Sequence, residues 1–305
     1  MRLTIGEGSL DWGFIRRRTV TGLTIAVFLV GTGGTAPFFL VPNTGNLWID
    51  AHIYFRATEA WLAGANPWAV TFNGIPFAAP PPALLLNLPL QFLGEEHAVW
   101  VWAVANTLSV AYLLRRFRLP IWYVVFLPIA EGWLAATPDL TLAALVFLGG
   151  SWLAALVKPY SIPAILAESR LKVVLVAFGL GIVTIPLLPW SEFFASRALI
   201  QGAFEDYTQT VSAFGDPVLM VVTAVALVSL GWERGLGLTT PGLLAQQPHY
   251  LMFSLKYIVA SRWLVLFMAL PLEHLAAVGI VAYAIWQRVG EPVSSRLGGR
   301  QRTVF

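Results

Sequence analysis

Long apolar runs, separated by short blocks of proline, glycine and charged residues, set the pattern of this 305-residue chain. A helical residue advances 1.5 Å, so about 20 apolar residues cross the roughly 30 Å hydrocarbon core of a bilayer. The pattern predicts an all-α polytopic membrane protein, with residues 1–305 as a single transmembrane domain. About eight transmembrane helices are expected, at residues 19–41, 97–114, 119–136, 140–165, 173–190, 217–231, 236–255 and 263–286.

Polar side chains interrupt the last two of these runs. Lys256 and Arg262 separate them, and Glu273 and His274 fall inside the final run. A charge within the bilayer is costly unless it is paired or reaches water. One span between residues 249 and 273 is therefore expected to be broken or re-entrant, and Glu273 and His274 are expected to form a hydrogen-bonded structural pair deep in the bilayer.

The longest interval between runs, residues 42–96, is predicted to be extracytoplasmic. It is too apolar and too rich in Trp and Pro for an ordinary solvated loop. Its stretch 50–62 predicts a helix along the membrane interface, and the Asp50 side chain suits an N-cap there. The residues from Gly64 to Pro67 are expected to end this helix.

Two further segments are expected on the same side. Residues 83–93 follow three consecutive prolines, and these 11 apolar residues are too few to cross a bilayer. They predict a re-entrant or interfacial helix. Residues 191–216 are more polar and predict a second extracytoplasmic segment, packed beside the first.

Composition places the chain in the membrane class. Hydrophobic residues make up 57% and charged residues 11%, and the mean hydropathy is +0.72. Soluble domains are about 45–50% apolar and about 25% charged, so water cannot be the main solvent of this chain. The sequence has no cysteine, which excludes disulfides and thiolate metal sites. It shows no P-loop, dinucleotide fingerprint or cluster of metal ligands, so no cofactor is predicted.

The basic residues predict the orientation, because cytoplasmic loops accumulate Lys and Arg. With an even number of spans and the N-terminus inside, 14 of the 19 basic residues are cytoplasmic, as are both termini. No nucleic-acid partner is expected. The cytoplasmic set is Arg2, Arg16, Arg17, Arg18, Arg115, Arg116, Arg118, Arg170, Lys172, Arg234, Arg288, Arg296, Arg300 and Arg302. The outer set is Arg56, Arg197, Lys256 and Arg262, and Lys158 falls within a span.

Five short motifs follow one another along the chain. They are Asp50 with Tyr54 four residues later, a turn with Gly64, Pro67 and Trp68, an apolar run with Phe77, Pro80 and Pro81, the pair Lys158 and Pro159, and the pair His249 and Tyr250. Their order, over residues 50–250, resembles that of the bacterial GT-C glycosyltransferases of the polyprenyl-phosphate-dependent mannosyl and arabinosyl type.

The resemblance implies a GT-C-like bundle in a bacterial plasma membrane that transfers a sugar from a polyprenyl-phosphate donor to a lipid or cell-envelope glycan acceptor on the outer face. It implies an inverting displacement in which one carboxylate takes the acceptor's proton, because a phosphate leaving group needs no acid. Asp50 is the candidate general base, and the alternative is that it only caps a helix. Tyr54 and Tyr250 are candidate substrate-binding residues, and membrane lipids are further partners.

Cations near these motifs are candidates for binding the donor phosphate. Lys158, inside a predicted span, is a functional candidate, although a lysine there can also snorkel or pair with an acid. His249 could hydrogen-bond the phosphate or the sugar, or be an ordinary interface residue. Arg56, Arg262 and Lys256 could bind a phosphate or contact lipid headgroups.

Two departures from the GT-C pattern favour a protein of a different class. Ala79 stands before the proline pair, where the family has a tyrosine. Only 19 residues separate Asp139 from Lys158, where a pair of spans is expected. The alternative is a non-catalytic GT-C-like subunit that serves as a scaffold among other membrane subunits. A transporter would show internal repeats, and none is visible in the sequence.

Overall fold

The computed structural model describes residues 12–40, 46–205 and 210–295. This part of the chain is mostly helical, which confirms the predicted all-α class. The first helices are α1 (Trp12–Leu40), α2 (Ile49–Leu62), η1 (Pro67–Ala69), η2 (Pro81–Leu86), η3 (Leu88–Leu93), α3 (Glu95–Arg116), η4 (Ile121–Val125), α4 (Leu127–Ala135), α5 (Pro138–Leu148), α6 (Ser151–Val157), η5 (Pro159–Ser161) and α7 (Ile162–Ala167). The others are α8 (Leu171–Thr184), α9 (Trp190–Ala195), α10 (Arg197–Glu205), α11 (Pro217–Ser229), α12 (Trp232–Gly237), η6 (Thr240–Leu244), η7 (Pro248–Ser254), α13 (Leu255–Val259), α14 (Arg262–Phe267) and α15 (Leu275–Ser295). The strands β1 (Thr71–Phe72) and β2 (Ile75–Pro76) form an antiparallel hairpin.

Two of the described helices are long and apolar enough to cross a membrane. They are Thr19–Leu40 within α1, and α3. A third crossing results if α4 and α5, which meet at a bend of 117°, count as one span. The spans predicted at residues 19–41 and 97–114 match α1 and α3, and the described residues support two or three candidate spans in place of the eight expected.

Glycine and proline break the run predicted as one span at residues 140–165. α5 ends at Gly149, which has a φ of +101°, and α6 ends before Pro159. Asp139 lies in the first turn of α5 and Lys158 directly follows α6, and their side chains meet at 3.2 Å, so the two helices run antiparallel. The interval from Asp139 to Lys158 therefore holds a pair of short helices. The sequence alone suggested that a pair of spans was missing there.

The C-terminal runs are also broken. The run predicted at residues 236–255 contains the end of α12, the π-helical turn η6 and the 3₁₀ helix η7, with Pro241 in η6 and Pro248 at the start of η7. Proline has no backbone N–H and cannot continue an α-helical ladder, which explains these breaks. The polar residues between 249 and 273 thus correctly indicated an interrupted segment.

Glu273 and His274 lie in the break between α14 and α15. The Glu273 side chain is 64% exposed, and its carboxylate lies 3.7 Å from the His274 ring. The His274 ring instead hydrogen-bonds the backbone carbonyl of Ser212, in the segment predicted to be extracytoplasmic. Glu273 and His274 therefore do not form the buried hydrogen-bonded pair that the sequence predicted.

α2 forms the helix predicted at residues 50–62. Its N-cap is Trp48, whose φ of 60° turns the chain into the helix without a side-chain cap. Asp50 is already inside the first turn, so its prediction as the N-cap is wrong. The helix ends at Leu62, and Gly64 follows with a φ of +73°, as the sequence indicated.

The second predicted helix of this loop, at residues 83–93, forms the 3₁₀ helices η2 and η3 instead. Consecutive prolines open η2 and another proline lies in the first turn of η3, so the N–H groups needed for an α-helix are missing. Two short helices replace the single one expected.

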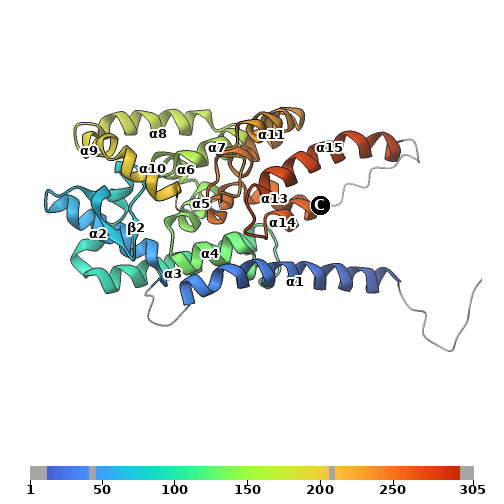
Figure 1. Ribbon diagram of the computed structural model, residues 1–305, viewed down its shortest axis with the longest axis horizontal. Helices are drawn as coiled ribbons and strands as arrows, with labels where there is room; N and C mark the ends of the chain where they lie inside the picture. Colours follow the sequence, from blue (N-terminus) through green and yellow to red (C-terminus); the bar gives the residue numbers. More distant parts are fainter. Residues whose placement is uncertain (1–11, 41–45, 206–209, 296–305) are drawn as a thin grey trace, which may run out of the picture.

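The loop after α1 and the segment before α11 lie against each other. Asn66 donates to the Ser196 hydroxyl at 3.0 Å, and the rings of Trp68 and Phe193 are 5.3 Å apart. Figure 1 shows α2 and β2 together with α9 and α10 at the left end of the bundle. The parts of these segments at residues 41–45 and 206–209 lie outside the described residues.

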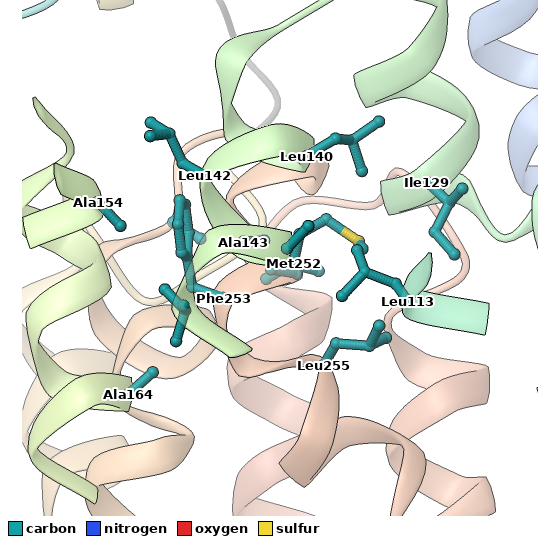
Figure 2. Packing of buried hydrophobic residues seen from close by; sticks show 14 of the residues in the cluster. Leu113, Ile129, Leu140, Leu142, Ala143, Ala154, Ala164, Met252, Phe253 and Leu255 are labelled. Carbon is teal, nitrogen blue, oxygen red and sulfur yellow. The ribbon is translucent and has the colours of Figure 1, made fainter. Parts of the chain in front are cut away.

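The core forms where η7 packs against α4 and α5. Met252 and Phe253 of η7 are fully enclosed, as are Leu140 and Ala143 of α5 (Figure 2). Close packing of such side chains leaves little room for movement. Because His249 lies in the same 3₁₀ helix, this packing also fixes its position.

α1 contacts the bundle mainly near its midpoint. The ring of Phe28 packs 4.9 Å from that of Phe126, and the Thr32 hydroxyl donates to the carbonyl of Val125 at 2.7 Å. Gly31 lies so close to Ala269 that a Cβ at this position would overlap its carbonyl oxygen. Much of the remaining surface of α1 is exposed, as is usual for a helix that faces lipid.

Lys256 lies beside a residue that the sequence predicted to be on the other side of the membrane. Its ammonium is 3.3 Å from Glu233 and also pairs with Glu168. Glu233 adjoins Arg234, so Lys256 lies close to a cation predicted to be cytoplasmic, and the two cannot lie on opposite faces of a membrane as the sequence predicted. The run before Lys256 is broken into short helices, so it does not separate the two residues as a single continuous span would. Of the predicted cytoplasmic cations, Arg2, Arg296, Arg300 and Arg302 lie outside the described residues.

Candidate active site

One cavity of about 510 Å³ gathers most of the predicted site residues. α2 contributes Asp50 and Tyr54, the end of α6 contributes Lys158, and η7 contributes His249 and Tyr250. The β1–β2 hairpin forms part of another wall. Three segments that are far apart in the sequence therefore meet here.

Lys158 is buried between an acid and aromatic rings. Its ammonium lies 3.2 Å from Asp139 Oδ1 and hydrogen-bonds the side chain of Tyr54. It also lies 5.5, 5.6 and 5.6 Å from the ring centres of Tyr54, Tyr160 and Tyr250, within the range of cation–π attraction. An ammonium has three N–H donors, so Asp139 and Tyr54 leave one for a ligand.

His249 lies between two carboxylates. Its Nδ1 is 3.0 Å from Glu131 Oε1, and its Nε2 is 3.3 Å from Asp139 Oδ2. The second contact is ionic, since Asp139 Oδ2 has no hydrogen-bond partner among the described residues. A carboxylate beside each ring nitrogen favours the imidazolium form. His249 and Lys158 are then two cations that balance Glu131 and Asp139.

Asp50 adds a third carboxylate beside this network. Burial raises the pKa of Asp50, against the opposing charges of His249 and Lys158, and its side chain hydrogen-bonds Thr137. The residue remains partly exposed because it borders the cavity. Burial also raises the pKa of Tyr54 to about 12, so this phenol stays neutral at physiological pH. A carboxylate with a raised pKa is a stronger base, which suits Asp50 to accept a proton.

A second cavity, of about 280 Å³, shares a wall with the first. Its other residues include Phe38 and Phe39 of α1 and Glu131 of α4. Groups bound in the two cavities would meet at the shared wall. That wall consists of Asp50, Ile75, Gln246, Gln247 and His249.

The structure does not bring Arg56 to this cavity. Its Nε donates to Glu95 Oε1 at 2.7 Å, and its guanidinium lies 4.5 Å from the centre of the Phe72 ring. His52 Nδ1 contacts the same Glu95 oxygen at 2.7 Å. Arg56 therefore anchors the hairpin and α3 to α2, and its predicted contact with substrate has no support from its position.

Arg262 is also remote from the cavity. It is exposed at the start of α14, and its charge acts on Tyr123 of η4. η4 begins shortly after Arg118, which was assigned to the cytoplasmic side. Arg262 therefore lies near a predicted cytoplasmic cation and cannot lie on the opposite face from it, and its predicted role at the site has no support from its position.

The cavity combines one candidate base with two cations. Within the described residues, no group of three or more His, Asp or Glu side chains is placed to hold a metal ion. The free N–H of Lys158 suits an anionic ligand, and Asp50 suits a ligand that must lose a proton. The arrangement can therefore bind an anion next to a proton acceptor.

Comparison with protein-family models, curated proteins and solved structures found no match to this chain. The resemblance to GT-C glycosyltransferases stays a prediction from the order of its motifs. The gathering of Asp50, Tyr54, Lys158, His249 and Tyr250 is an independent observation of geometry.

The sequence prediction missed several members of the network. Glu131 and Asp139 are acids within otherwise apolar runs, and ionisable residues in such runs are functional candidates by default. This signal was sufficient to find both. Tyr160 carries no comparable signal, and its hydroxyl donates to Asp139 at 2.9 Å.

Proposed function

We propose that the chain is a membrane glycosyltransferase. It moves a sugar from a polyprenyl-phosphate donor to a hydroxyl of a lipid or cell-envelope glycan acceptor, with inversion at the transferred carbon. The observation that carries the proposal is the single cavity that joins Asp50 to the buried cations Lys158 and His249. This set of groups suits a reaction that removes a proton and releases a phosphate.

The proposed step needs one base. Asp50 takes the proton of the acceptor hydroxyl while its oxygen attacks the anomeric carbon of the sugar. The bond from that carbon to the phosphate oxygen breaks, and the electron pair leaves with the polyprenyl phosphate. Lys158 and His249 stabilise the charge that develops there, and no acid is required for this leaving group.

The two cavities suit the two substrates. The larger one contains Lys158 and accommodates the donor phosphate, whereas the smaller one reaches α1, a largely exposed helix that could cross a membrane. A lipid-borne acceptor can approach along α1 and present its hydroxyl to Asp50. The apolar side chains of Phe38 and Phe39 suit the lipid part of such an acceptor.

The proposed location is a bacterial plasma membrane, with the site on the outer face and both termini cytoplasmic. The positions of Lys256 and Arg262 support this orientation, because both now join cations assigned to the cytoplasmic side. Introduced cysteines test it. A cysteine on the hairpin is expected to react with an impermeant thiol reagent added outside, and one near residue 234 is not.

Asp50→Asn tests the proposed chemistry. Asn cannot accept a proton, so sugar transfer from a polyprenyl-phosphate donor is expected to fall by about 10²–10⁴-fold. The matched control is Glu59→Gln, an exposed acid on the same helix, which should leave the rate unchanged. Radiolabelled donor in proteoliposomes provides the measurement, and equal rates in wild type and Asp50→Asn would disprove the role of Asp50.

The scaffold alternative gains some support from Ala79, which lines the cavity where the GT-C pattern has an aromatic residue. It predicts no transfer from any polyprenyl-phosphate sugar and stoichiometric co-purification with other membrane subunits. That combination of results would replace the enzyme proposal.

A further inference from the structure

Gln246 and Gln247 lie in the wall between the two cavities and border both. Each is only partly buried, and no hydrogen bond involves either side-chain amide in the described part of the chain. Gln91, by contrast, donates to the carbonyl of Phe55 at 3.2 Å. Two adjacent amides are therefore free to bind a ligand at the place where the cavities meet.

The backbone holds these amides in place. Ala245 receives a hydrogen bond from the Ser212 N–H at 3.1 Å and donates one to Thr240 at 2.8 Å. Gln247 is extended, with φ −127° and ψ 151°, as expected for a residue before proline, and its carbonyl accepts from the Tyr250 N–H at 3.2 Å. The segment is anchored on both sides of the glutamines, which limits the entropy lost when a ligand binds.

The position of the wall indicates which ligand group lies there. In the proposed transfer the phosphate leaves on one side of the sugar and the acceptor attacks from the other. The sugar must then occupy the boundary between donor and acceptor cavities, next to Asp50. An amide offers both a donor and an acceptor, which matches the hydroxyl groups of a carbohydrate.

We propose that Gln246 and Gln247 form the carbohydrate subsite and recognise the hydroxyl groups of the transferred sugar. The inference rests on the proposed function and adds the residues that select the sugar. Lys158, at the end of α6, binds the phosphate. The sugar is bound by a different element, the linker before η7.

Binding of two lipids to the full-length protein in nanodiscs tests this subsite. Wild type is expected to bind a polyprenyl-phosphate hexose about tenfold or more tightly than the same polyprenyl phosphate without sugar, because two neutral hydrogen bonds are worth about that factor. Gln246→Met and Gln247→Met keep the side-chain size but remove the amide. Each should reduce the preference by several-fold, and the double variant should abolish it while binding of the bare lipid is unchanged.

The control is Gln201→Ala, an exposed glutamine on α10, which should keep the wild-type preference. Unchanged binding of the bare lipid shows that a variant is folded. A double variant with the full preference, or a wild type without any preference, would overturn the subsite. A wild type that prefers the glycosylated lipid but transfers no sugar would overturn the proposed function and leave the subsite in place.

Discussion

Lys158 and Lys256 both pair with acids and lie close to tyrosine rings, yet their surroundings differ. The Lys158 side chain is 8% exposed and its partner Asp139 is fully buried, whereas Lys256 is 40% exposed and bridges Glu168 and Glu233. The two clusters lie at the two ends of α7, since Lys158 precedes this helix and Glu168 follows it.

The difference shows what each ion pair contributes. An exposed pair costs little to form and stabilises by at most about 1 kcal/mol. A buried pair carries a desolvation cost that its own attraction often fails to recover, so it is weak evidence for stability. The cluster around Lys158 is therefore explained better by the chemistry of the cavity, and the one around Lys256 by the anchoring of short helices.

The largest expected effect is that of Lys158→Met. It leaves Asp139 buried without its main cation, and breaking a buried pair costs about 3–5 kcal/mol of unfolding free energy. A loss near the lower end is expected, because Tyr160 and His249 still contact the carboxylate. Equilibrium unfolding in detergent provides the value, and affinity for the donor should fall with it. A change as small as that of Lys256→Met would remove the contrast.

The second variant, Lys158→Met with Asp139→Leu, removes both charges. No buried carboxylate is then left unpaired, so most of the stability lost in the single variant should return. Donor affinity should stay low, since the contact with phosphate is still missing. A double variant that is as unstable as the single one would show that stability depends on the pair itself.

Asp50→Asn should act in the opposite direction on stability. The folded protein holds the pKa of Asp50 above its ordinary value, so at neutral pH folding opposes the charge of this carboxylate. The destabilisation is absent in acid, where the carboxylate is protonated in both states. It grows as the pH rises above the pKa of Asp50 in the unfolded state. The variant is expected to gain about 0.5–2 kcal/mol at pH 7 and nothing near pH 3, measured by thermal unfolding. A loss of stability at pH 7 would contradict this account.

Lys256→Met should have the smallest effect, at most about 1 kcal/mol. Burial would raise the pKa of Glu168, but hydrogen bonds from Lys256 and Tyr257 outweigh it and lower the pKa. The stability from this carboxylate is therefore present above its unfolded pKa, about 4.3, and is lost as the pH falls through the lower folded value. The difference between Lys256→Met and wild type should accordingly stay flat from about pH 5 to 9 and shrink in acid. Loss of that difference in high salt would identify it as electrostatic.

The sequence was informative about the site and misleading about the spans. Asp50, Tyr54, Lys158, His249 and Tyr250 came from the order of short motifs, and the structure places all of them around one cavity. The order of short motifs does not depend on the lengths of the helices between them, so it is unaffected by the breaks in those helices. Arg56 and Arg262 were predicted as site residues from their charge alone. Arg56 instead pairs with Glu95, and Arg262 lies near Tyr123 of η4.

The count of spans failed because average hydropathy reports composition and not the continuity of a helix. Residues 140–165 are as apolar as a span, but glycines near 149 and the proline at 159 divide them into short helices. The angle between such helices depends on tertiary packing, such as that of η7 against α5. No window along the sequence contains both partners of that contact.

The close approach of Gly31 to Ala269 has a consequence for the second cavity. α1 is held near residues 28–32, and it forms a wall of that cavity only a turn or two later, at Phe38 and Phe39. A Cβ at position 31 would overlap the Ala269 carbonyl oxygen, so any side chain there would have to displace α1 or the Ala269 backbone and change this wall of the cavity. The position of α1, and with it the shape of the second cavity, thus depends on a hydrogen atom where other residues carry a Cβ.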